Sequence, residues 1–174
     1  EIKSPKDMVG MKYRIPNLPI FEKNARAMGA TPVVVAWSEY PFALMQGVVD
    51  GGECSKDSYR SSGLYESAKY VADVDYAYPV EQICFSTQFW NSLSEEDQKV
   101  ISDAAAQVAS HHSERTLDKW EEDKEWLINE GGVTFCDIDR QAFIDATEPL
   151  GKELQDEGFF TTKDLYDQTR QFNK

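Results

Sequence analysis

The segment from Met11 to Cys54, MKYRIPNLPIFEKNARAMGATPVVVAWSEYPFALMQGVVDGGEC, decides the fold. Short β-type runs alternate in it with helical patterns that repeat apolar residues every three to four positions. In order, these runs and patterns occupy residues 11–15, 20–28, 33–37, 39–46 and 48–53. Strands that alternate with helices at this spacing imply right-handed crossovers and a largely parallel sheet. We therefore predict an α/β fold.

Two details of this segment yield specific expectations. The run Val33-Val-Val-Ala-Trp37 is continuously apolar and rich in β-branched residues, which predicts a strand that is buried on both faces. Ser38 is a favourable N-cap for the helix over 39–46, and Pro41 is tolerated in its first turn.

The rest of the chain predicts a long helix between shorter elements. Two strands are expected over 69–78 and 81–86, joined near Pro79. Ser94-Glu-Glu-Asp97 then resembles a capping box, and the helical pattern that it opens reaches Asn129 before Gly131-Gly132. The expected divisions are an α/β ligand-binding core over 1–80, a crossing strand and short helix over 81–93, the long helix over 94–131, and a returning strand with C-terminal helices over 132–174.

The long helix carries two apolar stripes. The first contains Val100, Ile101, Ala104, Ala105, Val108 and Ala109, and the second contains Leu117, Trp120, Leu127 and Ile128. At ~1.5 Å per residue such a helix is longer than a small domain is wide. We therefore expect it to bridge two lobes, with one stripe packed on each.

Composition and charge exclude several classes of protein. Apolar residues make up 41% of the 174 residues, which is enough for a core, and the apolar runs are too short to span a bilayer. The net charge of −13 disfavours nucleic acid and anionic membrane surfaces as partners. An anionic ligand would be repelled by the whole molecule, so a specific buried cation would have to capture it.

The cysteines and histidines predict no metal site or cofactor. Cys54, Cys84 and Cys136 are far apart and have no CxxC spacing, so one disulfide or three free thiols are both compatible with the sequence. His111 and His112 are adjacent, so they point in different directions on a helix and cannot share a metal ion. No signal peptide is visible at the start of this sequence.

Candidate ligand contacts lie at the carboxyl ends of the three predicted strands, where α/β proteins bind ligands. Arg14 and Asn17 follow the first strand, and a guanidinium fits a carboxylate with two parallel donors. Arg14 is equally compatible with a structural ion pair to one of the many acids. Trp37 either walls a pocket or packs in the core. Glu53 and Cys54 follow a glycine pair that suits close backbone approach or a tight turn.

The same segments resemble the DctP-type solute-binding proteins of TRAP transporters. MVGMKYRIPN over 8–17 is similar to the family's DL-x-G-x-K-x-R-x-P-N, and MGATP over 28–32 to LGA-x-P. WSEYPFALMQGVVDG over 37–51 is similar to (F/W)-(S/G)-E-x-Y-x-A-L-Q-x-G-x-VDG, and FWNSLSEEDQ over 89–98 to x-W-x-x-L-(S/P)-x-E-x-Q. The segments agree in order and spacing from about residue 3 to 156.

The resemblance implies a periplasmic-binding-protein-like fold of type II, in which this chain supplies the second lobe, with a mixed and mostly parallel sheet, and the long lobe-bridging helix. It implies a bacterial periplasmic protein, not an enzyme, that delivers a carboxylate-bearing solute to a TRAP membrane permease. Arg14 then matches the arginine that clamps the ligand carboxylate, Asn17 a cleft position, and Trp37 the aromatic that packs on the ligand. Glu53 matches the acid of a QEN segment.

The sequence departs from the family pattern at two points. Gly52 replaces the usual Gln and Cys54 the usual Asn, and a thiol is a poor hydrogen-bond partner. Most of the first lobe is also absent, so we expect either self-association through the exposed lobe face or weak ligand binding. Two alternatives are an interaction domain without ligand capture and an enzyme that uses the Cys54 thiol as a nucleophile.

Overall fold

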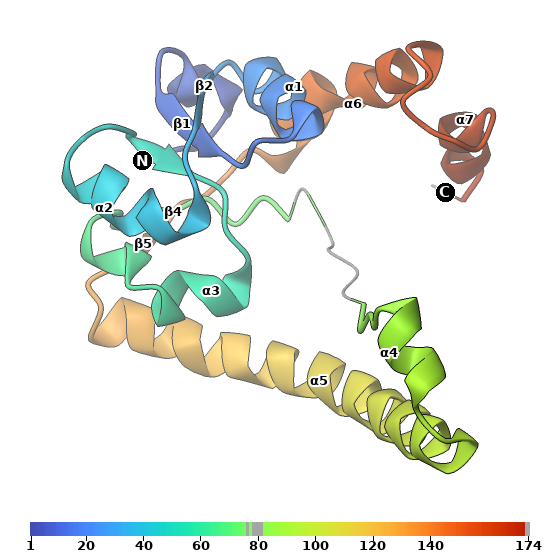
Figure 1. Cartoon of the computed structure of the whole chain (residues 1–174). Coiled ribbons are helices and arrows are strands. Elements are labelled where there is room, and N and C mark those ends of the chain that lie inside the picture. Colours follow the sequence, from blue (N-terminus) through green and yellow to red (C-terminus); the bar gives the residue numbers. More distant parts are fainter. Residues whose placement is uncertain (76, 78–81, 173–174) are drawn as a thin grey trace. The chain divides into compact units, whose positions relative to one another are not determined.

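The computed structural model describes residues 1–75, 77 and 82–172. The chain divides into two compact units, one formed by residues 1–74 with 127–174 and the other by residues 75–126. The first unit contains the parallel sheets, and the second contains α4 and most of α5 (Figure 1). The predicted α/β architecture is therefore confirmed.

A three-stranded parallel sheet organises the first unit. Its order is β2-β1-β3, with β1 at Lys12–Ile15 in the centre, β2 at Thr31–Val34 on one side and β3 at Gly51–Gly52 on the other. Arg14 is in register with both Val33 and Gly52. The central strand thus carries Arg14 between two neighbours, and its burial follows from that position.

Short helices connect these strands. α1 (Pro19–Ala27) joins β1 to β2, and α2 (Tyr40–Met45) joins β2 to β3. α1 begins with Pro19 and ends before Gly29, whose φ of +89° is costly for any residue with a Cβ. These crossovers match the predicted strand and helix order.

Two local predictions about this region are wrong. β2 stops at Val34 instead of continuing to Trp37, and it forms the edge of the described sheet, so Val34 is 57% exposed and the strand is not buried on both faces. Ser38 does not cap a helix, because Trp37–Glu39 form a 3₁₀ turn and α2 begins only at Tyr40, with Glu39 at its N-cap.

The remaining elements of the first unit complete its core. They are a 3₁₀ helix at Pro5–Met8, α3 at Lys56–Ser61, a 3₁₀ helix at Leu64–Glu66, β4 at Tyr70–Val71, β5 at Thr134–Phe135, α6 at Arg140–Asp156 and α7 at Leu165–Arg170. β4 and β5 form a second parallel pair. A buried cluster of Met8, Met28, Ala30 and Phe143 joins the start of the chain to α6.

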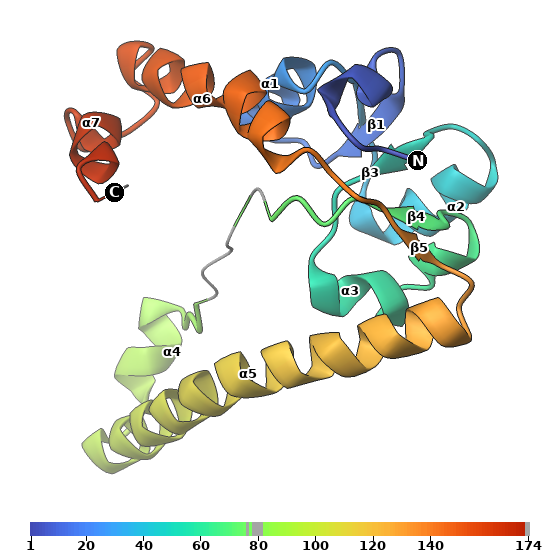
Figure 2. The ribbon, with the colours of Figure 1, turned by 180° about the vertical axis from the view of Figure 1, so that it is seen from behind.

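α1 and α6 are also linked at the surface. Lys23 Nζ donates to Glu153 Oε1 at 2.5 Å and to Glu157 Oε1 at 2.9 Å, across 130 residues of sequence or more. Both views of the ribbon place the two helices side by side (Figures 1 and 2). The C-terminal segment is thereby attached to the same unit as the three-stranded sheet.

The second unit holds α4 (Thr87–Ser92) and most of α5 (Glu95–Asn129), a single continuous helix (Figure 2). Ser94 caps the start of α5, as predicted: its Oγ accepts from the Asp97 backbone N–H at 3.1 Å, and the same Oγ donates to Asp97 Oδ2 at 2.7 Å. Within the described part of the chain, no helix combines the length and hydrophobicity needed to cross a bilayer.

The predicted strand over 81–86 is absent from its described portion, residues 82–86, which form an irregular segment. Pro79, where the two middle strands were expected to join, lies outside the described residues, and the strand expected over 69–78 is described only as β4. Aromatic packing replaces the strand: the Phe85 ring centroid lies 5.9 Å from that of Phe89 and 5.6 Å from that of Trp90.

Candidate functional site

Arg14 is the centre of the candidate site. The residue is 4% exposed, and it lies on the central strand. Its Nε donates to the Val35 carbonyl oxygen at 2.9 Å, and its Nη1 donates to Glu53 Oε1 at 2.9 Å. Two different strand ends therefore fix the guanidinium plane: Val35 follows β2, and Glu53 follows β3.

Three N–H groups of this guanidinium have no partner among the described residues. Of its five N–H groups, the one on Nε and one on Nη1 donate to described residues, which leaves one on Nη1 and both on Nη2. Among the described residues, no fully buried side-chain nitrogen or oxygen lacks a hydrogen-bond partner. Nη2 must therefore keep some contact with solvent. A fixed guanidinium with unused N–H donors suits a carboxylate.

Glu53 forms an ion pair with Arg14, and the pKa of its own carboxyl is shifted. Its side chain is 18% exposed, and burial raises the pKa of its carboxyl above the ordinary value, against the opposing effect of the Arg14 charge. The ion pair is therefore poorly hydrated and orients Arg14 more than it strengthens the fold.

Two aromatic rings line the guanidinium. Arg14 Cζ is 5.4 Å from the centroid of the Trp37 ring and 5.2 Å from that of Tyr40. Both distances fall in the range of cation–π contacts. Trp37 is 40% exposed, so part of its ring faces solvent beside Arg14, whereas Tyr40 is 2% exposed. A core-packing role for Trp37 alone does not account for that exposure.

Cys54 is partly buried next to this group. Burial raises the pKa of its thiol to about 12, and the neighbouring Glu53 charge acts in the same direction. A thiol protonated at neutral pH is a weak nucleophile, which opposes the thiol-enzyme alternative. Cys54, Cys84 and Cys136 are all free.

Asn17 does not belong to the cluster of residues around Arg14. It is exposed beyond the end of β1, and no contact joins it to Arg14, Trp37 or Glu53 within the described part of the chain. The structure thus brings together four of the five predicted residues, namely Arg14, Trp37, Glu53 and Cys54.

Two neighbours of Arg14 were not predicted from the sequence. The Val35 carbonyl is a backbone group that no side-chain pattern reveals. Tyr40 stands three residues after Trp37 in a turn and helix start, a spacing that places side chains near one another, and that was the available signal.

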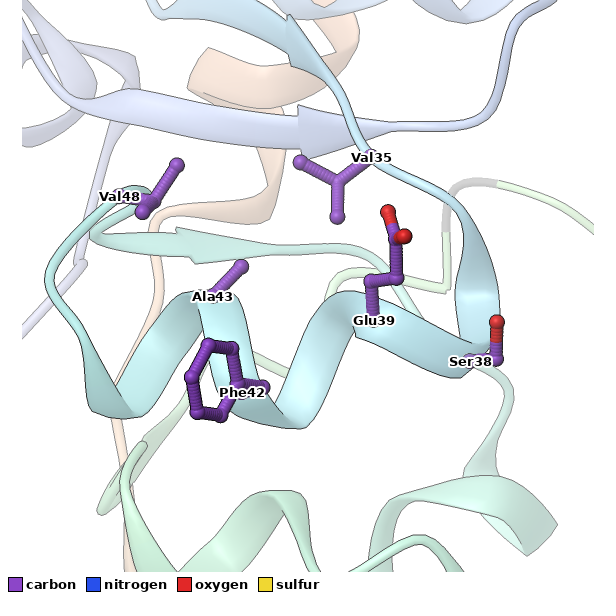
Figure 3. Close-up of a pocket in the computed structure, with 6 residues that line it drawn as sticks. All are labelled: Val35, Ser38, Glu39, Phe42, Ala43 and Val48. Atoms are coloured by element: carbon purple, nitrogen blue, oxygen red, sulfur yellow. The ribbon is translucent and has the colours of Figure 1, made fainter.

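The lining of the open cavity shown in Figure 3 includes Val35 but not Arg14, Trp37, Tyr40, Glu53 or Cys54. The cavity has a volume of about 400 Å³ and is lined by Val35, Ser38, Glu39, Phe42, Ala43 and Val48. Its lining comes from the segment between the end of β2 and the start of β3, and includes none of the five predicted residues. The Val35 backbone is nevertheless shared, because its carbonyl oxygen accepts from Arg14.

A fixed cation at the carboxyl end of a central parallel strand is typical of α/β proteins that bind small solutes. Comparison with known proteins agrees with this class. The chain belongs to family 7 of the bacterial extracellular solute-binding proteins, the DctP family, whose model matches residues 1–157.

Individual relatives support the same assignment. A solute-binding protein of Roseobacter denitrificans is 34% identical over 142 residues, covering 82% of this chain and 43% of the relative. A TRAP periplasmic solute-binding protein from Ochrobacterium anthropi, solved with bound L-fuconate, is 32% identical with a TM-score of 0.85, over 96% of this chain and 54% of that one. One from Chromohalobacter salexigens, solved with bound D-glucuronate, is 28% identical with a TM-score of 0.83, over 90% and 52%. The chain therefore spans about half the length of the proteins that it matches.

Proposed function

We propose that this protein is the extracytoplasmic solute-binding component of a TRAP-type transporter, and that Arg14 captures the carboxylate of a small solute. The observation that carries the proposal is the guanidinium of Arg14, which is buried, is fixed by Val35 and Glu53, and keeps N–H groups on Nη1 and Nη2 that donate to no described residue. A net charge of −13 makes such a local cation necessary for any anionic ligand.

Sugar acids are the proposed class of solute. Two solved relatives hold L-fuconate and D-glucuronate, and each of these molecules offers one carboxylate together with several hydroxyls. Trp37 complements such a ligand because its partly exposed ring can pack on the apolar face of a sugar beside the carboxylate. Asn17 and Cys54 are proposed as further contacts, Asn17 from the exposed loop after β1 and Cys54 from the strand end next to Glu53.

The remaining parts of the proposal follow from the family. We place the protein in the periplasm, with a TRAP membrane permease as its partner, and assign it capture of a solute without catalysis. The protonated thiol of Cys54 supports the last point, because it removes the most evident nucleophile near Arg14.

The proposal is tested by thermal-shift screening of this chain against a panel of hexuronates and aldonates. A ligand that binds the native state raises the melting temperature by mass action. Arg14→Ala should weaken the binding of any hit by a factor between ten and several thousand, equivalent to about 2–5 kcal/mol for a buried charge-assisted contact.

Arg26→Ala is the matched control, because it removes the same charge from an exposed arginine that pairs with Glu22 four residues away on α1. Equal loss of affinity in the two variants would assign the effect to net charge and remove Arg14 from the site. A panel without any hit would favour the alternative of an interaction domain that does not capture ligand.

A further inference from the structure

Tyr40 packs against Arg14 from the first position of α2. Its ring centroid lies 5.2 Å from Arg14 Cζ and 5.9 Å from the centroid of Trp37, while Trp37 lies 5.4 Å from the same Cζ. The three points form a nearly equilateral triangle. The rings therefore flank the guanidinium as adjacent walls and do not enclose it from opposite faces.

Gly52 provides the space that Tyr40 occupies. A Cβ atom on Gly52 would lie 2.7 Å from the Tyr40 hydroxyl oxygen, 2.7 Å from Arg14 Cβ and 3.0 Å from the Arg14 backbone oxygen, so Arg14 and Tyr40 both exclude a side chain there. The backbone angle φ of Gly52 is not positive, so glycine is needed at this position for space and not for its conformational freedom. The phenol of Tyr40 and the missing side chain of residue 52 are thus two parts of one arrangement around Arg14.

We propose that Tyr40 is a positioning residue that holds the Arg14 guanidinium in its ligand-ready orientation, and that the Tyr40 phenol, together with Arg14 itself, requires glycine at position 52. The inference deepens the proposed function and rests on it for its relevance to ligand capture. The contact of Tyr40 with Arg14 is a property of the ligand-free chain, so the positioning role is tested in the absence of ligand.

A purely structural role for Tyr40 makes a different prediction. Tyr40 is 2% exposed, so its truncation lowers stability in either case. If Tyr40 only fills the core, the orientation of Arg14 remains unchanged in any variant that still folds. If Tyr40 positions Arg14, the environment of the guanidinium changes even when the fold is intact.

The Nε–Hε group of Arg14 reports on that environment in a ¹H–¹⁵N NMR spectrum. Its hydrogen bond to the Val35 carbonyl oxygen slows exchange with water, and the nearby rings displace its proton resonance. Arg14→Lys assigns the signal. Loss of the Tyr40 ring changes the chemical shift in either case, so the exchange rate is the readout: in Tyr40→Leu we expect the Hε proton to exchange faster with water because its hydrogen bond to Val35 is weakened, whereas Tyr40→Phe, which keeps the ring, should retain the wild-type rate.

Phe42→Leu is the matched control, because it removes an aromatic ring from the same helix at a residue that is 58% exposed and lines the open cavity. This variant should leave the Arg14 Hε signal unchanged. A wild-type exchange rate of the Arg14 Hε proton in a folded Tyr40→Leu variant would overturn the positioning role.

The coupling to Gly52 is tested by a double-mutant cycle. Gly52→Ala should displace the Arg14 signal or unfold the protein, and the effect should be smaller in a Tyr40→Phe background, where the hydroxyl has been removed. Equal effects in both backgrounds, including unfolding in both, would assign the requirement for glycine to Arg14 alone and overturn the coupling to Tyr40. If Tyr40→Leu does not fold, this cycle decides the proposal.

Ligand affinity then separates this inference from the proposed function. With D-glucuronate as the probe, Tyr40→Leu should weaken binding at least tenfold and Tyr40→Phe should preserve it. If the wild-type chain binds no sugar acid, the proposed function fails, while the Arg14 signal still reports whether Tyr40 positions the guanidinium.

Discussion

At the scale of single residues, the Arg14–Glu53 ion pair determines how the candidate site responds to pH. Glu53 is held at 2.9 Å from a guanidinium that has little access to water, and burial outweighs the Arg14 charge in its effect on the Glu53 pKa. The folded state therefore binds this proton more tightly than the unfolded state does, for which the ordinary value is 4.5.

The sign of the effect on stability follows by linkage. As the pH rises above 4.5, Glu53 in the unfolded state loses its proton first, so the free energy of unfolding falls until the pH passes the raised pKa of the folded state. Glu53→Gln has no carboxyl to titrate at this position, so this contribution to the fall in the free energy of unfolding is absent from the variant. We expect the unfolding free energy of the wild type, minus that of Glu53→Gln, to decrease between pH 4.5 and 7.5 in urea titrations. An increase over the same range would show that the Arg14 charge outweighs burial.

The sequence was most informative about the individual residues of the candidate site. The R-x-P-N segment, the end of the Val33 run and the Gly-Gly-Glu turn indicated Arg14, Trp37 and Glu53, and the structure brings these side chains together. Tyr40 was missed because its contact with Arg14 depends on how α2 starts, which is a tertiary property. Asn17 was included by its proximity in sequence, but its loop leaves it exposed.

At the scale of elements, the order of strands and helices was predictable and their ends were not. Alternating apolar runs indicated β1, β2 and β3 and their crossovers, because parallel strands need helical connections. The pattern could not show that β2 stops at Val34, since a continuous apolar run is compatible with a buried strand or with an edge strand that leads into a 3₁₀ turn.

Two leucines of α5 offer a matched test of burial. Leu127 is fully buried and belongs to the first unit, whereas Leu117 is 70% exposed. Leu127→Ala should lower the free energy of unfolding by about 2–5 kcal/mol, because it leaves a cavity. Leu117→Ala, the same substitution on the same helix, should change it by no more than about 0.5 kcal/mol. Equal effects in chemical denaturation would contradict this difference in packing.

At the scale of the whole molecule, exposed apolar residues on α5 are the main unexplained surface. Two members of its first predicted stripe, Val100 and Val108, are 62% and 57% exposed, and Leu117 and Ile128 of the second stripe are also exposed. Only Trp120 and Leu127 of that second stripe are buried. The expectation that each stripe is covered therefore stays a prediction, and so does the role of α5 as a bridge between lobes.

Self-association would cover part of this surface. We expect size-exclusion chromatography with light scattering, at micromolar concentration, to give a mass above that of one chain. Val100→Glu and Val108→Glu together should restore the monomer mass, since they place charges in the exposed stripe. A clean monomer for the unmodified chain would contradict self-association and favour the alternative expectation, which is weak binding of ligand.

The central claim is that Arg14 interacts directly with a solute carboxylate, and calorimetric titration tests it through a cycle of ligand and protein changes. D-Glucuronate is compared with D-glucose, which lacks the carboxylate, on the wild-type chain and on Arg14→Ala. We predict that the wild type prefers the acid by about 2–5 kcal/mol and that Arg14→Ala loses this preference, because each change removes the same interaction. A preference for the acid that survives in Arg14→Ala would contradict the claim.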